Sequence, residues 1–140
     1  MNKLIVIGLL LLATNVFGQN VTELAIIVAK DDKTESLTLD EVRGIFLKND
    51  ASERFVARGL NEGSPERSFF ERKVLGMTVS QLRQHWGAKM NEGYEEWPRK
   101  TSAKSLVSFV SRGGRIGYLS ADQLAGLPKA DKVKVILVVK

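Results

Sequence analysis

The sequence predicts an α/β fold, in which helices cover a mixed or parallel sheet. Residues 24–29 form a continuous apolar run rich in β-branched side chains, which is typical of a strand buried on both faces. Residues 133–139, also rich in β-branched side chains, are expected to form a terminal strand. Between them, several segments combine a helix-capping sequence with apolar residues at helical spacing. The predicted order of elements is β α β α α α β α β, and we expect the strand at 24–29 to lie centrally in the sheet.

The first eighteen residues have the pattern of a secretory signal peptide. A basic tip at residues 1–3 precedes an apolar run at 4–13, and small Gly18 ends the segment. The run is about half as long as the roughly 20 residues that a membrane-spanning helix needs. We expect cleavage after Gly18, which leaves residues 19–140 as one periplasmic domain without stable membrane insertion. An uncleaved membrane anchor is the alternative.

The amino-acid composition limits the kinds of site and ligand that this chain could have. The 140 residues include no cysteine and one histidine, His85, which excludes disulfides, thiolate metal sites and histidine pairs. A domain of about 120 residues can still bury a sufficient core without such cross-links. The net charge is +5, and removal of Lys3 with the signal peptide leaves +4. In an exported protein this basic balance favours small anions or an acidic partner over nucleic acid.

Capping sequences and turn residues predict the helices and strands between residues 38 and 76. The sequence Thr-Leu-Asp-Glu at 38–41 is a capping box that opens a short helix. Residues 55–57 are expected to form a short strand that leads into the glycine-bracketed loop 58–63. Ser64 and Pro65 then supply an N-cap and a proline at the first helical position, and Gly76 ends this helix.

The second half follows similar rules. A second capping box at 78–81 opens a helix that carries Trp86 and ends near Gly93. Residues 92–100 are predicted to be a long irregular loop, after which Thr101 or Ser102 caps another helix. Residues 112–114 turn the chain into a strand at 115–119. Residues 120–123 cap a last short helix.

Four sequence pieces, taken in order, resemble a known family. They are residues 37–46 (LTLDEVRGIF), 63–70 (GSPERSFF), Trp86 and 114–118 (GRIGY). Together they are similar to the second lobe of bacterial periplasmic phosphate-binding proteins, the substrate-binding subunits of phosphate ABC transporters. The resemblance covers residues 21–120 and is strongest to short single-lobe relatives. It implies a single three-layer lobe of the type 2 periplasmic-binding-protein kind, with no catalysis and no cofactor.

Physical chemistry and the resemblance together nominate a small-oxyanion site, for phosphate or a similar ion. The start of a helix offers free backbone N–H groups and the positive end of a dipole, as at Ser64. Gly63 lets the loop approach a ligand closely, and Arg58 and Arg67 are potential charge-assisted donors. The candidate ligand-binding residues are therefore Arg58, Gly63, Ser64 and Arg67. The alternative is an ordinary helix cap beside solvated arginines.

Three departures from the family pattern argue against tight binding. Pro65 removes a backbone donor, and Glu66 places a negative charge where the family has a hydroxyl. The spacing from Arg58 to Ser64 is longer than in the family by about two residues. The whole first lobe is also missing, so an anion would face water, where each charged contact contributes about 1 kcal/mol or less. We expect millimolar affinity or none.

The competing hypothesis is a protein-interaction module that has kept the lobe and lost the ligand. Its partner surface would be the aromatic and basic loop containing Tyr94, Trp97, Arg99 and Lys100, or the face where the first lobe would dock. The two aromatic rings could instead pack onto the helix that bears Trp86. No Gly-x-Ser-x-Gly elbow surrounds any serine, and no loop has calcium-site spacing, so we expect neither an enzyme nor a metal site.

The signal-peptide interpretation predicts Gln19 as the mature N-terminus. Intact mass spectrometry of the exported protein measures this directly. A membrane-bound species that retains residues 1–18 would contradict the predicted periplasmic location.

Overall fold

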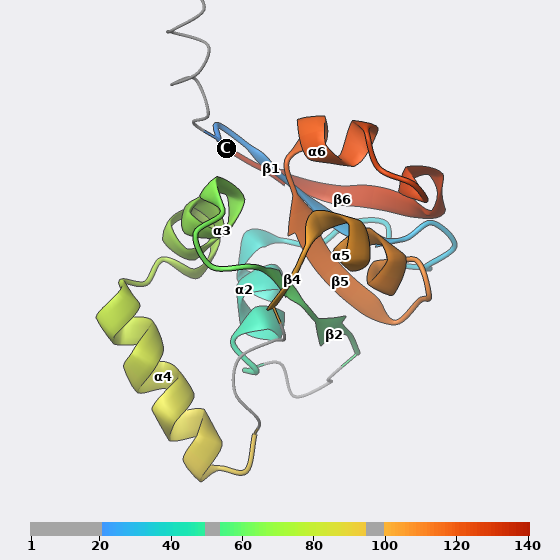
Figure 1. The fold of residues 1–140 in the computed structure, drawn as a ribbon. Coiled ribbons are helices and arrows are strands. Elements are labelled where there is room, and N and C mark those ends of the chain that lie inside the picture. Colours follow the sequence, from blue (N-terminus) through green and yellow to red (C-terminus); the bar gives the residue numbers. More distant parts are fainter. Residues whose placement is uncertain (1–20, 50–53, 95–99) are drawn as a thin grey trace, which may run out of the picture.

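The computed structural model describes residues 21–49, 54–94 and 100–140, and shows a four-stranded mixed sheet flanked by helices (Figure 1). The strand order is β2-β5-β1-β6. The bounds are β1 Leu24–Ala29, β2 Val56–Ala57, β5 Arg115–Leu119 and β6 Val133–Val139. Strand β1 runs antiparallel to both β5 and β6, whereas β2 runs parallel to β5. The predicted α/β class and the interior position of β1 are confirmed.

Helices and two short strands complete the described chain. The helices are α2 Leu39–Phe46, α3 Pro65–Phe70, α4 Val79–Asn91, α5 Ala103–Val110 and α6 Ala121–Ala125. A π-helical turn, η1 Glu71–Leu75, continues α3, and a 3-10 turn, η2 Ala130–Lys132, precedes β6. Strands β3 Gly59–Leu60 and β4 Lys100–Thr101 form a separate parallel pair. No helix in these described ranges is long and apolar enough to cross a membrane.

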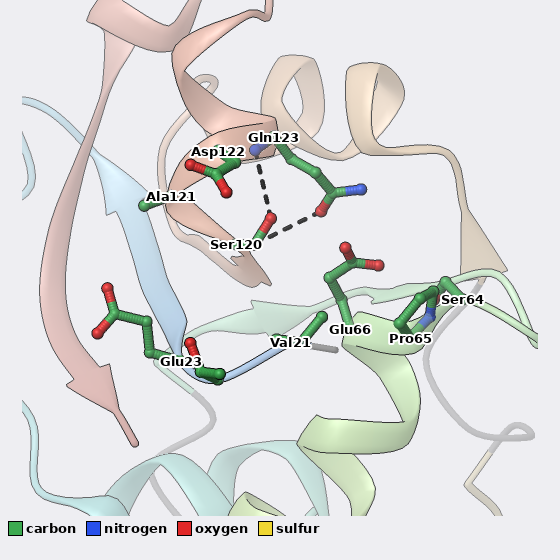
Figure 2. Close-up of a pocket in the computed structure, with 10 residues that line it drawn as sticks. Val21, Glu23, Ser64, Pro65, Glu66, Ser120, Ala121, Asp122 and Gln123 are labelled. Atoms are coloured by element: carbon green, nitrogen blue, oxygen red, sulfur yellow. Dashed lines mark hydrogen bonds between the residues drawn. The ribbon is translucent and has the colours of Figure 1, made fainter. Parts of the chain in front are cut away.

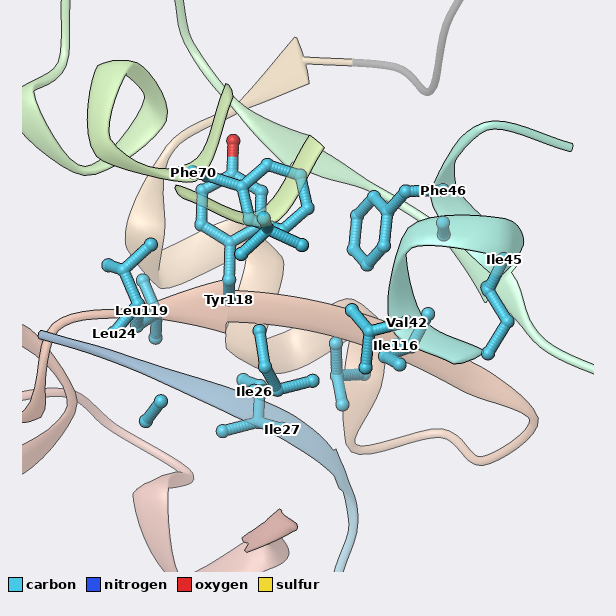
Figure 3. Close-up of a cluster of buried hydrophobic side chains, with 14 of the residues drawn as sticks. Leu24, Ile26, Ile27, Val42, Ile45, Phe46, Phe70, Ile116, Tyr118 and Leu119 are labelled. Atoms are coloured by element: carbon cyan, nitrogen blue, oxygen red, sulfur yellow. The ribbon is translucent and has the colours of Figure 1, made fainter. Parts of the chain in front are cut away.

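The core consists of the sheet with a layer of helices on each side. Successive side chains of β5 point to opposite faces of the sheet and so contact both helical layers. Ile116 and Tyr118 lie with Phe46 of α2 and Phe70 of α3 on one face (Figure 3). Between them in sequence, Gly117 faces Leu106 of α5 on the other side. Every residue of β1 is buried, as expected for a strand covered on both faces.

The predicted helix starts are confirmed at Thr38, Ser64, Thr78 and Ser120, whose hydroxyl oxygens each accept a backbone N–H three residues on. Of the two residues proposed to cap α5, Ser102 does so. Gly76 ends the 65–75 helical segment in the left-handed conformation, with φ of 64°. The π-helical turn before it was not foreseen.

Helix α4 is attached to the end of α2 by two side chains. The His85 ring Nε2 donates to the carbonyl oxygen of Leu47 at 2.8 Å. The Lys89 ammonium donates to the carbonyl oxygen of Lys48 at 3.0 Å. Carbonyl groups at the end of a helix such as α2 lack partners within the helix, and the two donors supply them. The negative end of the helix dipole also favours the positive charge of Lys89 there. His85 therefore has a structural role.

At Gly117, strand β5 and helix α5 lie too close together to leave room for a side chain. A Cβ at this position would lie 2.9 Å from Leu106 Cδ1. We predict that Gly117→Ala lowers the free energy of unfolding by about 1–3 kcal/mol through overpacking. Chemical denaturation measures this change. The matched control is Gly44→Ala in α2, where a Cβ meets no atom within 4 Å and should stabilise by about 0.5–1 kcal/mol. A neutral Gly117→Ala would contradict this packing.

Candidate functional site

A cavity of about 600 Å³ lies where β1 begins, β5 ends and helices α3 and α6 start (Figure 2). Residues 21–23, 64–66 and 120–123 line it. These segments meet because antiparallel β1 and β5 place Ala25 opposite Leu119, so that the start of one strand lies beside the end of the other. Ser64 of the predicted site is therefore at the cavity wall.

The two helix starts at the cavity are already capped by their own serines. Ser64 Oγ accepts the backbone N–H of Arg67 at 3.2 Å. Ser120 Oγ accepts the backbone N–H of Gln123 at 3.3 Å. Pro65 contributes no N–H, and α3 and α6 have only six and five residues. These starts consequently offer few free donors and a small dipole to an anion.

The side-chain charge of the cavity is negative. Glu23, Glu66 and Asp122 line it, and none of the described residues that line it is Lys, Arg or His. Figure 2 shows the Glu66 carboxylate directed into the space between α3 and α6. A like charge 4 Å away costs about 1 kcal/mol in water, and more where water is partly excluded. A helix start contributes about 0.3–1 kcal/mol in favour of an anion. At comparable distances, three carboxylates therefore outweigh the two helix starts.

Arg67, a predicted ligand contact, points into the protein. Its side chain is only 7% exposed. The guanidinium Nη1 donates to the carbonyl oxygen of Leu60 at 2.9 Å, and Nε lies 3.4 Å from Glu71 Oε2. Arg67 does not line the cavity. In this structure Arg67 therefore makes interior contacts, since burial is favourable only where such acceptors satisfy its charge. Its role in ligand binding stays a prediction.

The other backbone group of Leu60 is bound by Tyr118. The Leu60 N–H donates to the Tyr118 hydroxyl at 3.1 Å. The ring of Tyr118 stacks on Phe70, with centroids 3.9 Å apart and planes at 8° (Figure 3). Burial raises the pKa of the Tyr118 phenol well above its usual value. We call Tyr118, Leu60, Arg67 and Glu71 the Leu60 clamp.

Arg58, the second predicted arginine, also lies away from the cavity. Its backbone N–H donates to Ile116 at 3.2 Å, near the start of β5, whereas the cavity lies beyond the other end of that strand. Its guanidinium carbon is 3.7 Å from the centroid of the Phe109 ring. Gly63 has a φ of 84°, which allows the tight turn into α3, but it does not line the cavity. The structure therefore brings only Ser64 of the four residues to the cavity.

The predicted partner loop is only partly described. Tyr94 is half-buried, and its ring centroid is 5.3 Å from the Lys89 ammonium. The backbone of Lys100 belongs to β4. Trp97, Arg99 and the side chain of Lys100 lie outside the described residues, so this partner surface stays a prediction. Within the described chain, no group of three or more His, Cys, Asp or Glu could hold a metal ion.

Glu23, Ser120 and Asp122 were not foreseen as cavity residues. The sequence identified residues 120–123 only as a helix cap and assigned no site role to Glu23. These residues come together because β1 pairs antiparallel with β5, which places segments about 95 residues apart in sequence beside each other. The sequence alone did not show this pairing.

Comparison with solved structures shows two similar proteins. The chain matches a Clostridium perfringens protein assigned as a phosphate ABC transporter substrate-binding protein with bound phosphate, with a TM-score of 0.58 and 19% identity. It also matches an ABC-type phosphate transport receptor from Vibrio cholerae, with a TM-score of 0.56 and 17% identity. Each match covers 81% of this chain but 43% and 44% of the respective solved chains. No protein-family model and no curated protein matches.

These likenesses show the fold. The chain spans less than half the length of either solved protein, and it has the mixed α/β architecture of a periplasmic-binding-protein lobe. The predicted three-layer lobe is confirmed. Both similar proteins are described as binding components of transporters, and neither is described as an enzyme.

The Leu60 clamp predicts that Tyr118→Phe lowers the free energy of unfolding by about 1–3 kcal/mol. The reason is that the buried N–H of Leu60 loses its acceptor. Urea denaturation of both proteins measures the difference. Tyr94→Phe is the matched control, and because its hydroxyl is in a half-buried loop we expect a change within about 0.5 kcal/mol. Equal effects of the two substitutions would contradict the clamp.

The raised pKa of Tyr118 also predicts a pH dependence. Above pH of about 10, the usual tyrosine pKa, the unfolded chain loses a proton that the folded protein retains. The contribution of Tyr118 is therefore complete below about pH 10 and is lost as pH rises beyond it. Denaturation at pH 8 and pH 11 should show a steeper loss for the wild type than for Tyr118→Phe. Parallel losses would contradict the burial of this phenol.

Proposed function

We propose that this chain, which has the fold of one lobe of phosphate transport receptors, is an exported periplasmic interaction module without catalytic activity. Its binding face is the cavity between α3 and α6, and the ligand there is a basic segment of a partner protein.

The observation that carries this proposal is the charge of the cavity wall. Glu23, Glu66 and Asp122 line it from three different segments, and no basic side chain is among the described residues of its wall. Lysine or arginine side chains of a partner would meet these carboxylates in pairs that steer association and select among partners. The two arginines that could have given the wall a positive charge contact Leu60 and Phe109 instead.

Weak oxyanion binding is the second candidate. The Clostridium perfringens protein has phosphate bound, and Ser64 lines the cavity of this chain. In this alternative, phosphate or a similar ion would bind at Gly63 and Ser64, and Arg58 and Arg67 would have to turn toward it from their present contacts. Such a rearrangement would break the contacts of Arg67 in the Leu60 clamp and the stacking of Arg58 on Phe109. The free energy of these lost contacts is consistent with millimolar affinity at best.

NMR titration with an oligolysine peptide tests the leading proposal. We expect amide shifts at residues 21–23, 64–66 and 120–123, because these segments line the cavity. The double variant Glu66→Gln/Asp122→Asn should weaken binding at least about tenfold, since it removes two of three charges. The matched control is Asp31→Asn/Asp131→Asn, which removes two exposed carboxylates elsewhere on the surface.

Three outcomes would count against the leading proposal. Equal weakening by both double variants would mean that binding follows net charge and not the cavity. Phosphate-dependent shifts at residues 63–67 that vanish in Ser64→Ala would instead support the oxyanion candidate. Unchanged spectra with both oligolysine and phosphate would exclude both candidates at this face.

A further inference from the structure

We propose that strand β6 is a dimerisation edge, and that its partner is a second copy of this chain. The two β6 strands pair antiparallel across a two-fold axis near their middle, and this pairing joins the two sheets into one. The edge is separate from the acidic cavity, because no residue of β6 lines that cavity.

Within the described chain, β6 has a backbone partner on one side. It is the last strand in the order β2-β5-β1-β6, and its register pairs it with β1 (Figure 1). Alternate residues on its outer side therefore present N–H and C=O groups that another extended strand can bind. With seven residues β6 is long enough for such pairing, whereas β2 at the opposite edge has two.

A β-bulge in β6 places two valines on the same face of the sheet. The register against β1 shifts by one residue at Ile136, which is the extra residue of the bulge. On one side of the bulge, Val135 pairs with Ile27. On the other side, Val138 pairs with Ala25. Because Ala25 and Ile27 are alternate residues of β1, the two valines share a face, which residues three apart in a regular strand would not.

These two valines form an apolar strip along the outer edge of the sheet. Val135 is 44% exposed and Val138 is 49% exposed. Ile27 lies opposite Gly117 of β5, so the strip is on the face that α5 covers further in. Helix α5 therefore does not extend over the valines. Exposed β-branched side chains beside open backbone groups are the features that a further strand requires.

Strand β6 is self-complementary in an antiparallel pair. Val135 and Val138 lie on either side of its middle, so a two-fold axis between them brings Val135 of one copy beside Val138 of the other, twice. An axis perpendicular to the sheet keeps both strips on the same face, where the side chains meet as cross-strand apolar pairs. This match favours a second copy over a strand of unrelated sequence.

The charge within β6 is already neutralised. Lys134 is the charged residue of the strand, and its ammonium donates to the carbonyl oxygen of Asp32 at 2.6 Å and lies 3.2 Å from Glu35 Oε1. It pairs with Val28, so it is on the opposite face from the two valines. An unbound lysine commonly protects an edge strand from pairing. In the symmetric pair, Lys134 faces the apolar end of the other strand, so like charges do not meet.

Analytical ultracentrifugation of the purified protein over a concentration series tests the proposal. One pair of strands buries less than the roughly 1,000 Å² of stable complexes, so we expect a weak dimer with Kd on the order of 0.1 mM. The weight-average mass should rise with concentration toward that of two chains. NMR shifts on dilution should be confined largely to residues 133–139 and their neighbours in β1.

Two single substitutions locate the contact. Val135→Lys should weaken the dimer at least about tenfold, because a lysine at a strand edge opposes pairing. The matched control is Val56→Lys, which adds the same charge at an exposed valine of β2, on the opposite edge of the sheet. It should leave the dimer unchanged. Both valines are exposed, and far-UV circular dichroism checks that the variants fold.

Charge pairs at the two valines test the antiparallel arrangement. Val135→Lys/Val138→Glu places each lysine beside a glutamate of the other copy. It should dimerise at least about fivefold more tightly than Val135→Glu/Val138→Glu, in which like charges meet. The chain is basic, so the doubly acidic variant has the smaller net charge, and net repulsion alone predicts the reverse order.

A single-chain mass at every concentration would overturn the proposal. A dimer that Val56→Lys weakens as much as Val135→Lys would overturn it as well, because association would then follow net charge or another surface. Shifts at residues 133–139 that require added oligolysine peptide would show that the edge accepts a foreign strand, and this outcome also contradicts pairing between copies.

Discussion

Leu60 has both of its backbone hydrogen-bonding groups satisfied by side chains from elsewhere in the fold, Tyr118 at the N–H and Arg67 at the carbonyl. Buried backbone groups without partners are costly, so these two bonds fix the loop between β2 and α3 against β5. The stack of Tyr118 on Phe70 then ties the same loop to the core. The same segment is also held by the pairing of β3 with β4 and by the backbone hydrogen bond from Arg58 to Ile116.

The clamp also affects the charge of the cavity that we propose as the binding face. Arg67 lies in the first turn of α3 and is close to the cavity residues in sequence, yet its guanidinium contacts Leu60 and Glu71 instead. Because the Arg67 guanidinium is not at the cavity, the carboxylates of Glu23, Glu66 and Asp122 make the side-chain charge of the cavity negative. A fold shared with phosphate receptors therefore presents an acidic surface here. Arg58 likewise lies over Phe109 and not at the cavity.

Features with local causes could be predicted from the sequence. The long runs rich in β-branched side chains gave β1 and β6 their correct bounds, and the hydroxyl-led capping sequences located the starts of α2, α4 and α6. The two-residue strands β3 and β4 are too short to leave a periodic signal. The direction of Arg67 could not be predicted, since it depends on where Tyr118 places Leu60, 58 residues away in sequence.

The most direct test of the clamp is NMR detection of the hydrogen bond between the Arg67 guanidinium and the Leu60 carbonyl. The measurement is through-bond coupling between Arg67 Nη and the Leu60 carbonyl carbon, together with the solvent exchange of the guanidinium protons. The account predicts a measurable coupling, slow exchange, and no change on addition of millimolar phosphate. Rapid exchange with a phosphate-dependent shift at Arg67 would contradict it, because the arginine would then belong to the binding face.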